Sequence, residues 1–92
     1  MEIEIRRTVV EVHVPPGGRS PDEAHPGREV RFQVVRGTLS FRLGGRELSL
    51  GEGERVTVPA GVGHAYWNDG AEPALFVAET RSLSDEPNRR GI

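Results

Sequence analysis

The chain has 92 residues, of which 35% are hydrophobic and 28% charged, a balance typical of one globular domain. Its net charge of -2 offers no basic surface to a phosphate backbone, and an aromatic content of 5% is too low for a base-stacking platform. Nucleic acid is therefore excluded as the expected partner. The sequence has no cysteine and no lysine, which excludes disulfides, zinc-thiolate sites and Schiff-base catalysis on lysine.

The sequence also carries signals for location and assembly. No apolar run approaches the roughly 20 residues that cross a bilayer, and residues 1–12 lack the hydrophobic core of a signal peptide. We therefore expect a cytoplasmic protein with no membrane partner. A domain of this size buries a modest fraction of its surface when it folds, which favours a homodimer.

The N-terminal third consists of an alternating segment followed by a loop. Apolar and polar residues alternate from Ile3 to Val14, which is the period of a half-buried strand. Pro15–Gly18 ends this pattern, and the chain up to Gly27 is rich in glycine, proline, serine and charge. The sequence therefore predicts a strand and then a long loop.

The remainder predicts short strands separated by turns. Alternating or apolar segments occupy residues 30–34, 39–43, 48–50, 56–58, 64–67 and about 74–80. Gly44-Gly45 suits the positive φ values of a tight hairpin turn. Turns at intervals of about 8 to 12 residues indicate an all-β sandwich or barrel. Residues 81–92 form a polar tail, which we expect to be frayed or packed against a partner subunit.

One segment has a spacing that positions a histidine. In GEGERVTVPAGVGHAYWN, five residues separate Gly53 from Pro59, and Gly61, His64 and Asn68 follow at fixed intervals. Gly53 permits the turn that starts a strand, and Pro59 ends the hydrogen bonding of that strand. Gly61 lets the backbone reverse. His64 is therefore expected to re-enter the sheet and face its interior.

This run resembles the second conserved motif of the cupin superfamily at every fixed position, and the resemblance covers about residues 14–80. It implies an all-β, single-domain cupin fold, a jelly-roll β-barrel with residues 1–92 in one domain and an N-terminal strand that pairs in a dimer. In metal-binding cupins the histidine of this motif is a ligand, and His64 matches it. The alternative is a histidine satisfied by hydrogen bonds in a barrel without metal.

The first cupin motif, a glycine, a loop, His-x-His, Glu and a final glycine, is matched only in part. Aligning its last glycine on Gly37 places Val30 at the glutamate, His25 at the second histidine and Glu23 at the first. Glu23, His25 and His64 would supply two imidazoles and a carboxylate, a donor set for Fe, Mn, Ni or Zn. The alternative is a degenerate site, because Val30 is apolar.

Four further residues are candidates for the wall of a pocket around His64. Tyr66 and Trp67 alternate in direction, so one is expected inside the barrel and the other outside or in an interface. Val30 and Phe32 share the inward face of their strand, although Phe32 is equally interpretable as plain core. Glu29 could replace the missing glutamate only from the opposite face of that strand.

Three functions follow as hypotheses, and the sequence leaves open whether the protein is an enzyme. The first is a cupin that binds a small molecule in the barrel interior, with a reduced metal site centred on His64. The second is a metal-dependent enzyme of the dioxygenase, isomerase or cyclase type that uses Glu23, His25 and His64. The third is a structural module whose barrel is filled.

Overall fold

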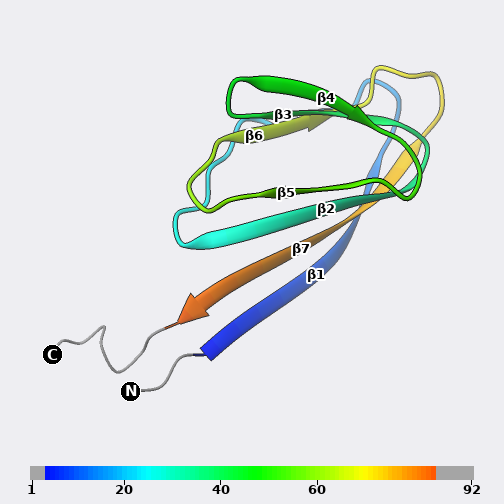
Figure 1. The fold of residues 1–92 in the computed structure, drawn as a ribbon. Coiled ribbons are helices and arrows are strands. Elements are labelled where there is room, and N and C mark those ends of the chain that lie inside the picture. The colour runs from blue at the N-terminus through cyan, green and yellow to red at the C-terminus, as the bar shows by residue number, and fades with distance from the viewer. Residues whose placement is uncertain (1–3, 85–92) are drawn as a thin grey trace, which may run out of the picture.

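The structure is a computed structural model that describes residues 4–84, and within them every regular element is a strand. The strands are β1 (Glu4–Val14), β2 (Arg28–Arg36), β3 (Leu39–Leu43), β4 (Arg46–Leu50), β5 (Arg55–Val58), β6 (His64–Trp67) and β7 (Ala74–Ser84). They form a four-stranded sheet in the order β1-β7-β2-β5 and a three-stranded sheet in the order β4-β3-β6 (Figure 1). All pairings between these strands are antiparallel, and the expected all-β jelly roll is confirmed. Residues 4–84 contain no apolar helix of membrane-spanning length.

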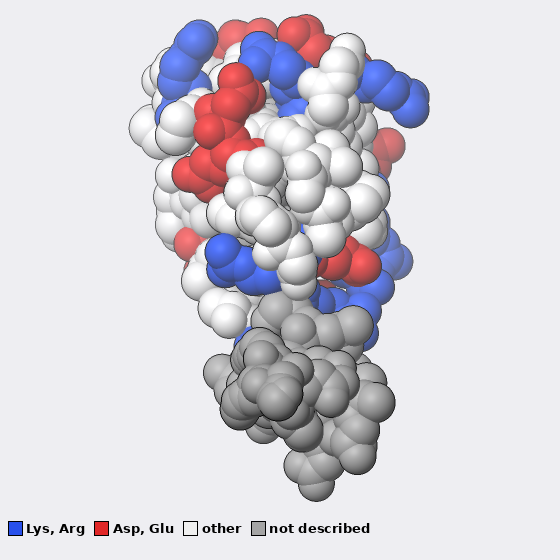
Figure 2. Space-filling model, turned by 90° about the vertical axis from the view of Figure 1, so that its left-hand side faces the viewer, with Lys and Arg blue, Asp and Glu red and all other residues white. Residues whose placement is uncertain are grey.

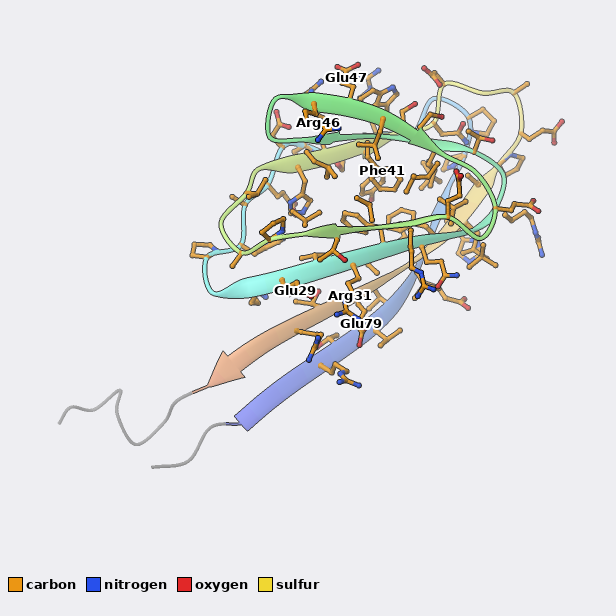
Figure 3. All side chains as sticks on the ribbon, viewed as in Figure 1. Glu29, Arg31, Phe41, Arg46, Glu47 and Glu79 are labelled. Carbon is orange, nitrogen blue, oxygen red and sulfur yellow. The ribbon has the colours of Figure 1, made fainter. Side chains whose placement is uncertain are left out.

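The core lies between the two sheets. In β2 the alternating residues Val30, Phe32 and Val34 are all buried, as the period of the sequence predicts. Phe32 stacks on Phe41 of β3 with ring centroids 5.1 Å apart, and Figure 3 shows Phe41 pointing into the space between the sheets. The predicted Gly44-Gly45 hairpin is also confirmed, because Leu43 pairs with Arg46.

The first and last strands form a long ribbon on one side of the molecule. β1 and β7 pair over eleven residues, from Glu4–Ser84 to Val14–Ala74. β7 therefore continues four residues beyond Thr80, where apolar alternation stops, because pairing with β1 still satisfies its backbone. β1 is the outer strand of its sheet, and Val9 is 61% exposed there. Residues 85–92 of the expected tail lie outside the described residues.

The segment between β1 and β2 is more ordered than the predicted loop. Its residues run antiparallel to β6, with isolated bridges that pair Arg19 with Trp67 and Glu23 with His64. Glu23 and His64 exchange two backbone hydrogen bonds of 2.9 and 2.8 Å. Between the bridges, the Ser20 hydroxyl accepts a 3.0 Å hydrogen bond from the backbone N–H of Tyr66. This segment covers the free side of β6 and fixes Glu23 beside His64.

Candidate metal centre

Three metal-ligating side chains converge at one end of the barrel. Glu23 and His25 belong to the segment beside β6, and His64 is the first residue of β6. One donor atom from each residue lies within 4.8 Å of the other two. His25 Nε2 lies 3.4 Å from Glu23 Oε1. The backbone pairing of Glu23 with His64 therefore brings together side chains that are 41 positions apart in sequence.

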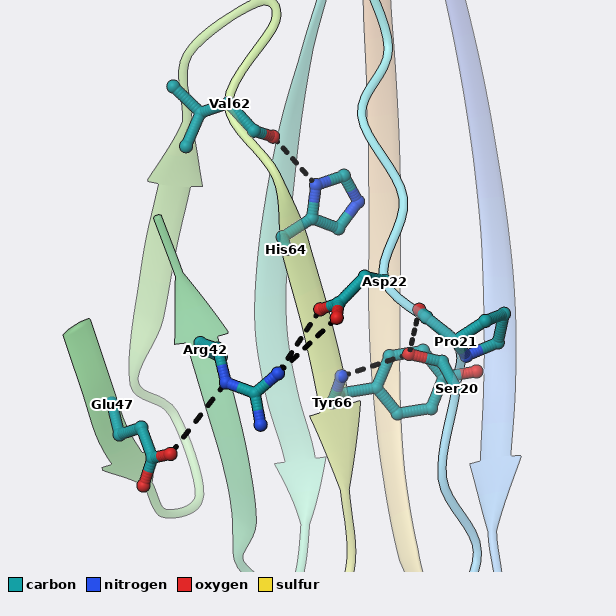
Figure 4. Close-up of polar contacts among 8 residues, drawn as sticks. All are labelled: Ser20, Pro21, Asp22, Arg42, Glu47, Val62, His64 and Tyr66. Carbon is teal, nitrogen blue, oxygen red and sulfur yellow. Dashed lines mark hydrogen bonds and ion pairs between the residues drawn. The ribbon is translucent and has the colours of Figure 1, made fainter. Parts of the chain in front are cut away.

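His64 is held in an orientation that suits a metal ligand. Its side chain enters the barrel after the turn at Gly61, whose φ of 82° is the left-handed conformation expected of that glycine. Its Nδ1 lies 3.2 Å from the backbone carbonyl of Val62 (Figure 4). A carbonyl only accepts hydrogen bonds, so Nδ1 carries the proton and Nε2 keeps its lone pair. The residue is 7% exposed, which shields that lone pair from bulk water.

His25 makes a contact that competes with metal binding. The guanidinium Nη2 of Arg28 lies 3.4 Å from His25 Nδ1. A guanidinium only donates, so Nδ1 accepts, and the proton on Nε2 then faces Glu23. A metal bound through Nε2 would reverse these roles and displace Arg28. Arg28 is exposed, so its side chain has room to move away.

The three residues fit a first-row transition metal. Metal bonds to imidazole nitrogen and carboxylate oxygen are about 2.0–2.2 Å long, so two donors at the tetrahedral angle around one ion lie roughly 3.3–3.6 Å apart. The span of 4.8 Å requires the cluster to contract by roughly 1.2–1.5 Å. Glu23 is exposed and can make this adjustment. Two imidazoles and one carboxylate leave coordination positions open for a ligand.

The donors open onto a cavity of about 160 Å³. Its other lining residues are Val12, Ser20, Val30, Phe32, Tyr66, Phe76, Ala78 and Thr80. Val30, Phe32 and Tyr66, proposed from the sequence as pocket residues, all line it. Val30, at the position of the family's glutamate, presents an apolar side chain to the same cavity as His64. Glu29 points to the other face of β2, where its carboxylate pairs with Arg31 at 3.1 Å (Figure 3).

Trp67 is absent from the residues that line this cavity, which corrects its assignment to the pocket. It follows Tyr66 in β6, so its side chain points to the opposite face of the strand. There its ring lies under the guanidinium of Arg42, whose Cζ is 5.4 Å from the ring centroid. Ser20 and Thr80 are cavity residues that sequence reasoning missed. The alternation of Thr80 with Ala78 and Phe76 was a usable signal, whereas Ser20 had none.

Tyr66 is expected to lose its phenolic proton at a higher pH than an ordinary tyrosine. Burial raises the pKa of its phenol above the usual 10.0, and the negative charge of Glu23 raises this pKa further. Tyr66 is the only tyrosine, and the chain has neither lysine nor cysteine. Ultraviolet absorbance of the phenolate therefore reports this residue alone. The midpoint should lie above pH 10 in the folded protein and fall when Glu23 is replaced by glutamine.

The same shift predicts the direction of a stability change. The phenol is harder to ionise in the folded state than in the unfolded state. Its contribution to the free energy of unfolding is therefore fully present below pH 10 and is lost as pH rises through the folded-state pKa. The free energy of unfolding should decline above pH 10, and Tyr66→Phe should remove that decline. If Glu23→Gln left the midpoint of the Tyr66 titration unchanged, that result would contradict the proximity of Glu23 to the phenol.

Comparison with known proteins places this geometry in a family. Residues 10–78 match the family model described as a cupin domain. The crystal structure of TT1209 from Thermus thermophilus is 28% identical, with a TM-score of 0.76, and the match covers 78% of this chain and 69% of that chain. No relative was found among curated proteins.

Two solved structures with lower identity share the fold. A predicted oxalate decarboxylase from Thermotoga maritima is 20% identical with a TM-score of 0.78, over 80% of this chain and 64% of that chain. A recombinant oxalate oxidase in complex with glycolate is 23% identical with a TM-score of 0.77, over 85% of this chain and 45% of that chain. This chain thus spans less than two thirds of either protein. With the family model matching residues 10–78 of 92, the chain belongs to the cupin family.

Proposed function

We propose that this cupin binds a small molecule in its barrel, beside a divalent transition metal held by Glu23, His25 and His64. The observation that carries the proposal is the convergence of these donors, within 4.8 Å, on the wall of a cavity. When bound, the metal would supply a Lewis acid with open positions for an oxygen donor. Fe, Mn, Ni and Zn all accept this donor set.

The cavity limits the size and character of the ligand. Its volume of about 160 Å³ is well below the roughly 300–1,000 Å³ of sites for drug-sized molecules. Val30, Phe32 and Phe76 supply apolar walls, and Tyr66 adds a side chain with one polar group to the same lining. A compound of a few carbon atoms with a carboxylate for the metal fits this environment. The glycolate in the oxalate oxidase structure suggests small carboxylates as the first compounds to test.

A metal-dependent enzyme of the dioxygenase, isomerase or cyclase type is the second candidate. Tyr66 favours it, because it lines the cavity with the three donors and its phenol is able to donate a hydrogen bond to a bound substrate. The cavity disfavours the third hypothesis, a filled barrel. The homodimer and the cytoplasmic location stay predictions from the sequence.

The proposal is tested by metal analysis followed by ligand screening. Protein purified without chelators should contain close to one equivalent of transition metal by mass spectrometry. Glycolate, oxalate and related small carboxylates should then raise the melting temperature of the metal-loaded protein. The rise should vanish after chelation. A rise that survives chelation would show that the ligand does not bind through a metal, and no rise with any carboxylate would contradict the proposed ligand class.

Val30→Glu is expected to increase metal affinity. Val30 lines the cavity with the three donors, so a carboxylate there would add a fourth. A buried carboxylate is costly without a partner, so the metal-free variant should also be less stable. Calorimetric titration with Mn²⁺ or Ni²⁺ measures the affinity. Val30→Gln is the matched control, since glutamine has nearly the same shape as glutamate but carries no charge. Equal affinities in the two variants would show that residue 30 does not face the metal.

A further inference from the structure

The outer face of the three-stranded sheet carries a second concave region around Trp67. This residue is the only tryptophan in the chain, and it lies outside the barrel core. Two hollows meet at its ring. One, of about 390 Å³, is lined by residues that include Arg19, Ser20, Asp22 and Arg42, and the other, of about 260 Å³, by Ser40, Glu47, Leu48 and Ser49. The two hollows share Trp67 and are here together called the outer groove.

Polar contacts link three side chains of the outer groove. The Nη1 of Arg42 lies 3.3 Å from Asp22 Oδ1, and its Nε lies 3.7 Å from Glu47 Oε2 (Figure 4). Asp22 belongs to the segment on one side of β6 and Arg42 to β3 on the other, so their ion pair spans the strand. The guanidinium also lies over the indole of Trp67. The groove thus presents exposed donors and acceptors, paired with one another, beside an aromatic ring.

The charges of the outer groove balance one another. Arg19 and Arg42 carry two positive charges, and Asp22 and Glu47 carry two negative ones. Such a site has no net field to attract an anion or a cation. On the face turned to the viewer in Figure 2, basic residues lie next to acidic ones, and the acidic ones form a small group at the upper left. The groove is therefore suited to a neutral polar ligand.

We propose that the outer groove binds a saccharide. A sugar ring has an apolar face that packs on an indole, where it would take the place of the Arg42 guanidinium, and its hydroxyls both donate and accept hydrogen bonds. The groove offers the matching acceptors on Asp22 and Glu47 and the matching donors on Arg19 and Arg42. Ala65 and Ser40 are small and leave room beside Trp67. Trp67 lies on the opposite face of β6 from His64, whereas Ser20 and Tyr66 line both the larger hollow and the cavity of the metal centre.

The single tryptophan makes the proposal directly testable. Glucose, galactose, N-acetylglucosamine and cellobiose are titrated into the full-length protein while its fluorescence is recorded. At least one should give a saturable change, with a Kd on the order of 1 mM or tighter. Asp22→Asn should weaken that binding by about tenfold, because it removes a charged hydrogen-bond acceptor worth roughly 1.5 kcal/mol. Asp22 is exposed, so the variant should fold normally.

Two control variants test whether the sugar binds in the outer groove. Arg46→Gln changes an exposed arginine on the same sheet that lines neither hollow (Figure 3), and it should bind the sugar as the parent does. His64→Ala should also leave the titration unchanged. No fluorescence change with any of the four sugars would overturn the proposal. So would a response to benzoate or phosphate alone, which would indicate an anion site, or full binding by Asp22→Asn.

Discussion

His64→Ala is expected to abolish stoichiometric binding of transition metal. His64 is the most buried of the three donor residues. Among the ring nitrogens of His25 and His64, the Nε2 of His64 is the one whose lone pair is left free by the hydrogen bonds described above. Removal of a residue that merely orients a ligand typically weakens metal affinity by 10- to 100-fold, so loss of the ligand itself should exceed about 100-fold. Mass spectrometry of the purified variant and calorimetric titration measure the loss.

His13→Ala is the matched control for this variant. His13 lies in β1 and is exposed, so the same substitution removes an imidazole without touching the site. Circular dichroism should show that both variants keep the β-sheet fold. Metal retained by His64→Ala would place the ion elsewhere. Metal missing from the parent protein as well would support the degenerate site that Val30 suggested.

The fold followed from the sequence because its signals are local. Alternation gave the strands, and the Gly44-Gly45 dipeptide gave the hairpin, since both depend on neighbouring residues. Alternation also predicted the part of the site that β6 carries. Once the turn at Gly61 directs His64 inward, Tyr66 must share its face and Trp67 must lie opposite. Applied strictly, alternation would have kept Trp67 out of the pocket.

The other part of the site depends on pairing that has no local signal. Residues 15–27 contain four prolines, and on composition they indicate a loop. In the structure they lie along β6, and the Ser20 side chain supplies one of the hydrogen bonds. This pairing brings Glu23 to His64 and Asp22 to Arg42. It depends on an edge strand distant in sequence, so no local pattern predicts it. The resemblance to the cupin motifs had grouped Glu23 and His25 with His64, whereas nothing in the sequence pointed to the pairing of Asp22 with Arg42.

Asn68→Ala is expected to cause a large loss of stability. Asn68 is 2% exposed, and its side-chain amide donates to the carbonyls of Val14 and Glu72, at 3.0 and 2.8 Å. Its oxygen accepts a 2.9 Å hydrogen bond from the backbone N–H of Gly70. The residue thus joins the end of β1 to the turn before β7. Alanine would leave these groups without their partner at a cost of about 2–4 kcal/mol.

Thermal and urea unfolding measure this effect. For a domain of this size each kcal/mol shifts the melting temperature by about 4–8 °C, so a decrease of at least 8 °C is expected. Gln33→Ala, which removes an exposed amide from β2, should change the free energy of unfolding by less than about 0.5 kcal/mol. Asn68→Asp should also destabilise the protein, because a carboxylate cannot donate to the two carbonyls. Similar melting temperatures for Asn68→Ala and Gln33→Ala would show that this hydrogen-bond network contributes little, and that sheet packing alone fixes the ends of β1 and β7.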